Sequence, residues 1–127
     1  MTAPKTVPRL TYSQSTGLML LDSMQVGTGY SGYGRFKNSP DEQALANRGP
    51  IPRGLYTVGL AFKHPSLGHL TMRLVPYLHD ACGRHGFLVH GDNLQSVGDS
   101  SQGGIVLPRP ARQIIAGLGN AILAVVR

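Results

Sequence analysis

The sequence contains a single cysteine, Cys82, among its 127 residues. One thiol forms no disulfide within the chain and builds no four-thiolate zinc site. The five histidines include no pair at helical ligand spacing beside a carboxylate, and no phosphate-binding glycine loop is present. We therefore expect neither a metal nor an organic cofactor.

Long apolar runs are also missing. Residues 1–9 lack the apolar stretch of a secretory signal, and no later segment reaches the roughly 18 apolar residues that a membrane span requires. We expect no membrane span and synthesis in the cytoplasm without a signal peptide. Residues 1–9 are expected to form a flexible N-terminal segment.

Acidic residues are scarce. Six of them stand against twelve Lys and Arg, which gives a formal net charge of +6 and a pI near 10. Such a charge attracts any polyanion, whether nucleic acid, membrane headgroups or an anionic cell wall. The basic residues are scattered singly, however, and no aromatic-rich motif of an RNA-binding sheet accompanies them. A nucleic-acid-binding β-domain therefore rests on net charge alone, and we expect no nucleic-acid partner.

Length and composition predict one mainly β domain that spans residues 1–127. A chain of this length matches a single core. Apolar residues make up 41%, charged residues only 14%, and there are 17 glycines, which favours a folded, turn-rich chain over a disordered one. We expect a bent sheet or β-sandwich with one or two short helices, and a monomer.

The predicted strands are short apolar runs bounded by Gly, Pro or polar turns. They are a hairpin over residues 10–22, two strands at 55–62 and 69–75, two that lie side by side at 86–90 and 104–107, and a final strand at 121–126. Residues 27–39 carry too many glycines for an interior strand and are expected to form a surface loop. Helical turns are predicted from Pro40 to Ala46 and from Pro108 to Leu118.

The stretch richest in chemistry runs from His90 to Ile105. A histidine ends one predicted strand, and a glycine-rich loop leads into the next. Cysteine acyl transfer needs a thiol beside an imidazole that takes its proton, and backbone N–H donors that face the developing oxyanion. Two adjacent strand ends are able to supply all three groups.

Several motifs in fixed order carry a resemblance to a known family. They are Tyr-x-Gln-Ser-Thr-Gly at 12–17, Gly-Tyr-Ser-Gly at 29–32, Gly-Pro-Ile-Pro-x-Gly-x-Tyr at 49–56, Gly-Arg-x-Gly-Phe at 83–87, His-Gly-Asp at 90–92 and Ser-x-Gly-Gly-Ile at 101–105. The chain resembles the L,D-transpeptidase-like domain of bacterial type VI secretion effectors from about Leu10 to its last residue. In that family the last motif reads Ser-x-Gly-Cys-(Ile/Val), and Gly104 stands here in place of the cysteine.

The resemblance implies an antibacterial toxin that acts on the tetrapeptide stems of peptidoglycan. In this family a cysteine attacks the bond after the L-centre of the diamino acid and forms a thioester. Water then gives L,D-carboxypeptidase activity, and an amine gives L,D-transpeptidase exchange. It also implies secretion by a type VI system, action in the target-cell periplasm, and as partners stem peptides, a cognate immunity protein and a component of the secretion apparatus.

The same resemblance assigns roles to named residues. His90 is the expected general base. Gly103 and Gly104 are expected to bring backbone N–H donors to the oxyanion, with Gly104 at the position of the nucleophile. Ser101 is expected to hydrogen-bond the loop or the histidine rather than to attack the substrate.

Substrate contacts are expected from three residues near the histidine. Asp92 is a candidate to orient the imidazole or to bind the cationic end of the diamino acid, and Arg84 is a candidate to pair with a stem carboxylate. Gly91 lies between the histidine and Asp92 and completes the expected substrate-binding set. For Asp92 and Arg84 a solvated surface position is the alternative.

Gly104 leaves three explanations open. It is an introduced inactivating substitution, a natural change that makes the domain a non-catalytic peptidoglycan-binding pseudoenzyme, or the sign of a displaced nucleophile such as Cys82. Removal of the attacking group costs about a millionfold in rate in related hydrolases. The chain as written is therefore not expected to turn over by the cysteine route.

Overall fold

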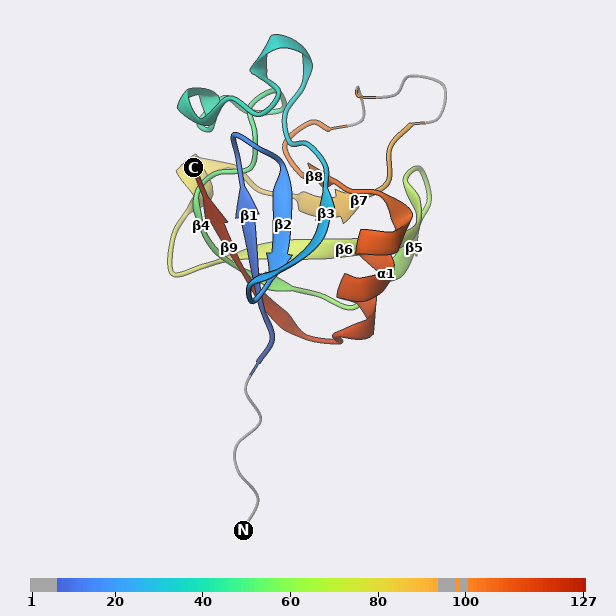
Figure 1. Ribbon diagram of the computed structural model, residues 1–127. Helices are drawn as coiled ribbons and strands as arrows, with labels where there is room; N and C mark the ends of the chain where they lie inside the picture. The colour runs from blue at the N-terminus through green and yellow to red at the C-terminus, as the bar shows by residue number, and fades with distance from the viewer. Residues whose placement is uncertain (1–6, 94–97, 99–100) are drawn as a thin grey trace.

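The last strand of the chain lies in the middle of the sheet, between the first strand and the fourth. Figure 1 shows this arrangement in the computed structural model, which describes residues 7–93, 98 and 101–127. The strands are β1 (Arg9–Ser13), β2 (Leu18–Leu21), β3 (Met24–Thr28), β4 (Gly54–Val58), β5 (Phe62–His64), β6 (Gly68–Tyr77), β7 (Phe87–His90), β8 (Ile105–Val106) and β9 (Ala121–Val126). The helices are α1 (Arg109–Gly117) and three 3-10 turns, η1 (Gly34–Phe36), η2 (Pro40–Glu42) and η3 (Ala81–Gly83).

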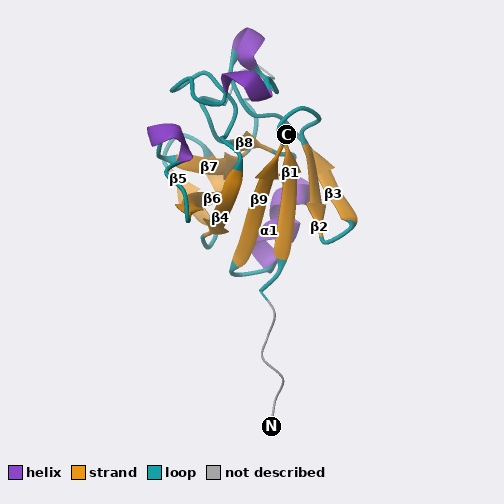
Figure 2. Cartoon of the chain, turned by 90° about the vertical axis from the view of Figure 1, so that its left-hand side faces the viewer, coloured by secondary structure: helices purple, strands orange, loops and turns teal. Residues whose placement is uncertain are grey.

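The nine strands form one sheet in the order β3-β2-β1-β9-β4-β6-β7-β8, with β5 paired to β6. The β1–β9 and β7–β8 pairs are parallel and the others are antiparallel. Figure 2 shows β4, β9, β1, β2 and β3 side by side in front of α1. The prediction of a mainly β chain with a bent sheet and short helices is confirmed, and the strands curl within a single sheet.

Side-chain alternation builds the core between this sheet and α1. In β9 Ala121, Leu123 and Val125 are buried, while the residues between them are only half-buried. Strand period two places all three on one face, the face that α1 covers with Ala111 and Ile115. A fully buried Leu or Val contributes roughly 1.5–3 kcal/mol, so this shared face accounts for much of the packing.

The helix approaches β3 closely because that strand carries a glycine. A Cβ on Gly27 would lie only 2.7 Å from the Cβ of Ala111. The glycines of residues 27–39 predicted a loop from residue 27 onward, and β3 instead continues through Thr28 before the loop begins. The glycine at 27 therefore serves close packing inside a strand.

Most of the other predicted elements are found. The 10–22 hairpin, the helix after Pro108, the last strand and the side-by-side pair β7 and β8 are all present. The predicted strand at 55–62 is wrong as one unit, because β4 ends at Val58 and β5 begins at Phe62. The segment after Pro40 forms a single 3-10 turn followed by turns rather than an α-helix.

The N-terminal segment expected to be flexible lies partly outside the described residues, since the structure describes none of residues 1–6. Its last residue, Arg9, already belongs to β1, and Pro8 accepts a hydrogen bond from the N–H of Ile122 at 2.9 Å. In the described part of the chain, no helix combines the length and the apolar character needed to cross a membrane.

Candidate functional site

The parallel pair β7 and β8 sets the geometry around His90. In its register Val89 lies beside Ile105, and His90 lies beside Val106. Gly104, one position before β8, therefore lies beside Leu88. The histidine at the end of one strand and the glycine at the start of the next are thus held on neighbouring backbones, as the sequence predicted for these two runs.

His90 is buried, with 4% of its surface exposed, and its imidazole is held by the backbone that follows it. The ring Nδ1 lies 2.8 Å from the carbonyl oxygen of Gly91. Because a carbonyl oxygen only accepts, Nδ1 carries the hydrogen, and in the neutral ring Nε2 keeps the free lone pair. This tautomer leaves one nitrogen able to take a proton.

The surroundings of His90 favour its neutral form. Burial lowers the pKa of the imidazole below its usual range, and the positive charge of Arg112 acts in the same direction. The hydrogen bond to Gly91 and the negative charge of Asp92 oppose this shift in pKa. Burial prevails, so the ring is a neutral proton acceptor at physiological pH.

One cavity of about 540 Å³ contains both His90 and the backbone of Gly104. The residues around it are Ala46, Asn47, Leu67, Gly83, Arg84, His85, Gly86, Phe87, Leu88, His90, Gln102, Gly103 and Gly104. Among the described lining residues the ionisable side chains are one arginine and two histidines, and none is a carboxylate. We call this cavity the cleft; its lining suits a ligand that carries negative charge.

The backbone of Gly104 is fixed by two buried hydroxyls. Ser31 Oγ donates to the Gly104 carbonyl oxygen at 2.6 Å, and Ser101 Oγ donates to the same oxygen at 2.9 Å. Both serines are fully buried. No role was predicted for Ser31 from the sequence, although it lies within the Gly-Tyr-Ser-Gly motif at 29–32, which was the available signal.

Gly104 has no space for a side chain. A Cβ built on its backbone would overlap the carbonyl oxygen of Leu88 and come within 3.1 Å of the Leu88 nitrogen. Both clashing atoms belong to the main chain of β7, so no rotation of a side chain relieves the overlap. Any larger residue at 104 requires β7 and the 101–104 segment to move apart.

Ser101 holds the 101–104 segment in place by hydrogen bonds. Besides its bond to Gly104, its Oγ accepts hydrogen bonds from the N–H groups of Gly32 and Gly103, at 2.9 and 3.3 Å. The hydroxyl is thereby fully used. The bond from Gly103 also means that its N–H points at Ser101, and of the two expected oxyanion donors only the N–H of Gly104 remains a candidate.

Arg84 is buried against main-chain oxygens rather than set on a solvated surface. Its guanidinium donates to the carbonyl oxygens of Gln43, Pro50 and Gly49, at 2.5, 2.8 and 3.1 Å. Burial also lowers its pKa. The side chain lines the cleft, but these three bonds tie the 43–50 segment to the cleft wall, which is a different use from the expected pairing with a ligand carboxylate.

Asp92 caps the loop that follows His90. Its Oδ1 accepts from the Tyr30 hydroxyl at 2.7 Å and from the Asn93 N–H at 2.9 Å, and both of its oxygens accept from the Gly98 N–H. The structure thus places this carboxylate within electrostatic reach of His90, whereas the ring hydrogen bond goes to Gly91.

Gly91 is the third residue of the expected substrate-binding set, and its Cα faces a cation. A Cβ at this position would lie 2.7 Å from a guanidinium nitrogen of Arg112. Arg112 is itself held by the carbonyl oxygens of Leu107 and His69, each at 3.0 Å. The glycine thus lets α1 place its arginine against the loop that holds the imidazole.

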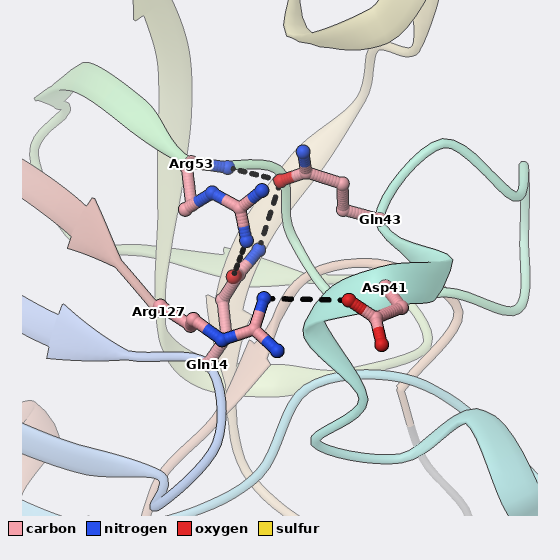
Figure 3. Close-up of polar contacts among 5 residues, drawn as sticks. All are labelled: Gln14, Asp41, Gln43, Arg53 and Arg127. Atoms are coloured by element: carbon pink, nitrogen blue, oxygen red, sulfur yellow. Dashed lines mark hydrogen bonds and ion pairs between the residues drawn. The ribbon is translucent and has the colours of Figure 1, made fainter.

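The side chain of Gln14 bonds to Gln43 and Arg53, as Figure 3 shows, and thereby holds the 43–53 segment. Gln14 is fully buried, and its Nε2 donates to the Ile51 carbonyl oxygen at 2.9 Å and to Gln43 Oε1 at 3.1 Å. Arg53 completes the network by donating to Gln14 Oε1 at 3.0 Å. The Tyr-x-Gln-Ser-Thr-Gly motif therefore acts on the site through Gln14.

Two buried hydrogen bonds hold the motif at 49–56. The N–H of Ile51 donates to Ser31 Oγ at 2.8 Å, and the hydroxyl of buried Tyr56 donates to the Pro52 carbonyl oxygen at 2.7 Å. Figure 1 shows this segment leading down into β4. These two contacts fix the backbone of the segment that leads into β4.

Cys82 is not part of the cleft. It lies in η3 with an exposed side chain and a left-handed backbone (φ 56°), and it is absent from the residues that line the cavity. None of the described lining residues carries a thiol, a hydroxyl, an amine or a carboxylate able to act as a nucleophile. As far as its described residues go, the cleft has an imidazole base without an attacking group.

Comparison with known proteins identifies both the family and the fold. A family model described as the Tlde1 domain matches residues 25–121. An L,D-transpeptidase from Mycobacterium smegmatis has 15% sequence identity and a TM-score of 0.54 over 94% of this chain. One from Mycobacterium tuberculosis H37Rv has 17% identity and a TM-score of 0.58 over 95%. The fold is therefore that of the L,D-transpeptidases, as the motifs implied.

A third solved structure, an L,D-transpeptidase in complex with imipenem, has 17% identity and a TM-score of 0.54 over 94% of this chain. The chain spans 58–59% of the length of these three structures. No curated protein sequence matches this chain significantly.

Proposed function

This chain belongs to the Tlde1 domain family of type VI secretion effectors, and from that premise we propose that it is a toxin domain directed at the tetrapeptide stems of peptidoglycan. The observation that carries the proposal is the cleft. Its lining includes both His90, whose Nδ1 is held by the Gly91 carbonyl oxygen, and Gly104, and the two residues lie on the neighbouring parallel backbones of β7 and β8.

The charge of the cleft supports a stem peptide as ligand. Arg84, His85 and His90 are its ionisable groups, and the described lining includes no carboxylate. A tetrapeptide stem ends in a carboxylate and presents amide groups along an extended backbone. Arg84 keeps the field of the cleft positive while its guanidinium is bonded to main-chain oxygens, so its effect on the ligand is exerted by charge.

The chemistry of the family route defines what each residue would do with a cysteine at position 104. The thiol proton passes to His90 Nε2, and the thiolate attacks the carbonyl carbon that follows the L-centre of the diamino acid. The C–N bond breaks, the departing amine takes the proton from His90, and a thioester remains. Water or a free amine then attacks the thioester and restores the thiol.

With glycine at 104 the route has no first step. The imidazole and the Gly104 N–H remain, but no described lining residue provides the attacking atom. We therefore propose that this chain binds stem peptides without cleaving them, because loss of the nucleophile lowers the rate by about a millionfold.

A second candidate is a domain whose cleft serves only for binding. The packing of Gly104 against the Leu88 main chain favours it, because that packing leaves no space for the Cβ of a cysteine. On this proposal the domain acts by occupying stem peptides. On the first proposal, the glycine at 104 removes the nucleophile from a site that is otherwise arranged for catalysis.

The same premise extends to location and partners. Secretion into target cells follows from membership of the effector family, and we propose the target-cell periplasm as the place of action. An immunity protein in the producing cell and a component of the secretion apparatus are the proposed protein partners, and the domain itself is proposed to be a monomer.

Binding of a synthetic tetrapeptide to the unmodified chain tests the proposal directly. We expect saturable chemical-shift changes at residues 83–90 and 102–104, and weaker binding by His90→Gln. His69→Gln, at an exposed histidine outside the cleft, is the matched control. Absence of saturable binding, or equal loss by the control, overturns the assignment of the cleft.

Gly104→Cys separates the two candidates. The variant is first shown to be folded, and digested tetrapeptide muropeptides are then analysed by mass spectrometry. Loss or exchange of the terminal residue that disappears in the Gly104→Cys, His90→Gln double variant supports the disarmed enzyme. A folded variant that binds the tetrapeptide and leaves it intact supports the binding domain.

A further inference from the structure

A second groove lies between the β5–β6 hairpin and the start of α1. We call it the basic groove; it has a volume of about 470 Å³ and is lined by Ala61, Phe62, Lys63, His69, Leu70 and Arg109. None of these residues lines the cleft that contains His90. The basic groove is therefore a separate feature of the surface, and the proposed function assigns nothing to it.

A β-bulge shapes one wall of this groove. Phe62 pairs with Thr71 and His64 pairs with Gly68, so two residues of β6, His69 and Leu70, stand opposite the single Lys63. In a regular strand consecutive side chains point to opposite faces. The bulge brings His69, Leu70 and Lys63 to the same groove instead.

The bulge is maintained at a conformational cost. Leu70 has a φ of 57°, in the left-handed region that a branched side chain rarely adopts, and the cost is about 1–2 kcal/mol. Bulges of this kind are common beside functional sites because they redirect side chains. The strained backbone of Leu70 is thus part of the bulge that places the groove-lining side chains.

No described carboxylate forms an ion pair with Lys63 or Arg109. The residues of the groove come from two stretches of sequence, 43–79 and 100–127, which contain no Asp or Glu at all. Within residues 7–93, 98 and 101–127 the structure forms one ion pair, between Arg127 and Asp41, away from Lys63 and Arg109. Arg112 donates to the His69 carbonyl oxygen of this wall, and its pKa is lowered by burial and further by the positive charge of Arg109.

The floor of the groove is apolar. Phe62 lies under the guanidinium of Arg73, with 4.9 Å between the guanidinium carbon and the ring centroid. Leu60, just before the groove in sequence, is 68% exposed. Cations around an apolar floor with an exposed leucine beside it match an anionic group joined to an apolar body.

We propose that the basic groove binds a phosphate or phosphodiester group, with Lys63 and Arg109 as its cationic contacts and Phe62 and Leu70 as the surface for the apolar part. Phosphate is chosen because its three or four acceptor oxygens match several donors at once. The group is carried on a lipid headgroup or free in solution, and the two sources are distinguished below.

Titration with inorganic phosphate at constant ionic strength, followed by amide NMR, tests the groove in the intact chain. We expect saturable shifts at residues 61–63, 69–70 and 109. The double variant Lys63→Gln, Arg109→Gln is expected to weaken binding by about tenfold for each cation removed. The matched control is Arg9→Gln, Arg35→Gln, which removes the same charge at exposed positions outside the groove and is expected to leave the affinity unchanged.

Cosedimentation with vesicles identifies the source. Retention on phosphatidylglycerol–phosphatidylcholine vesicles but not on pure phosphatidylcholine, lost in the groove variant alone, supports a lipid headgroup. Saturable phosphate binding without vesicle retention supports a soluble phosphate. Equal losses by the groove variant and the control, or no saturable binding in either experiment, overturn the proposal.

Discussion

The carbonyl oxygen of Leu88 occupies the space in which a side chain on Gly104 would begin. This contact joins two neighbouring strands of the site through main-chain atoms alone. It makes the glycine a structural requirement of the present packing, whatever residue the relatives carry at the same position.

Gly104→Ala is therefore expected to destabilise the fold by about 1–3 kcal/mol, the usual cost of overpacking a tight site. Urea denaturation monitored by circular dichroism measures the change in free energy of unfolding. Gly117→Ala is the matched control, because outside its own helix turn no atom lies within 4 Å of the added Cβ and alanine favours the helix. A neutral Gly104→Ala would show that β7 and β8 separate easily.

Removal of either serine hydroxyl should loosen the Gly104 carbonyl. Ser31→Ala leaves the buried Ile51 N–H without its acceptor, and we expect a loss of about 1–3 kcal/mol in the free energy of unfolding. Ser101→Ala likewise deprives the Gly32 N–H of its acceptor.

Because Ser31 and Ser101 share one acceptor, their double variant is expected to show non-additive losses in a double-mutant cycle of unfolding free energies. Ser66→Ala, at an exposed serine, is the control for the substitution itself. If the losses of unfolding free energy in the two single variants were strictly additive, the two hydroxyls would not act together on the Gly104 carbonyl oxygen.

The pKa of His90 is expected to lie below its usual value of about 6.5 in the folded chain, because burial disfavours the charged ring. The unfolded chain then binds the proton more readily. The contribution of His90 to stability is present in full above pH 6.5 and is lost as the pH falls through the folded pKa.

Denaturation curves recorded from pH 7.5 down to the acid range measure this dependence. His90→Gln should flatten it, whereas His85→Gln, at an exposed imidazole of the same cleft, should leave it in place. An NMR titration of His90 that gave a pKa above 6.5 would contradict the expected balance of burial and charge.

Arg84→Lys is expected to cost about 3 kcal/mol, because an ammonium cannot satisfy three carbonyl oxygens that the planar guanidinium reaches together. In Arg84→Lys, the amides of residues 43–50 should lose protection from hydrogen exchange before those of the sheet do. Arg48→Lys, at an exposed arginine of the same segment, is the control. Unchanged protection in Arg84→Lys would mean that the segment is held by Gln14 and Ser31 alone.

Local patterns were sufficient to predict the strands whose apolar runs are bounded by turns. They failed where tertiary packing decides the structure. Gly27 indicated a loop, but the need for α1 to approach β3 explains that glycine. The parallel pairing of β1 with β9 joins segments more than a hundred residues apart, and no local signal reports it.

The sequence predicted where the candidate site lies better than it predicted what each of its residues does. The order of motifs brought His90 and Gly104 together correctly, because both lie at strand ends whose pairing the apolar runs implied. The partners of Arg84 were not predictable, since the five N–H donors of a guanidinium are able to bond either carboxylates or carbonyl oxygens. Ser31 was missed because a serine among glycines is also typical of an ordinary loop.

The position of β9 has a consequence for how the domain opens. Within the sheet, β9 pairs with β1 along one edge and with β4 along the other, so it joins β3, β2 and β1 to β4, β6, β7 and β8. A bridge between the backbones of Tyr30 and Val106 links the two sides a second time. Local fraying of this strand would divide the sheet, so its amides are expected to exchange with solvent only when the whole domain unfolds.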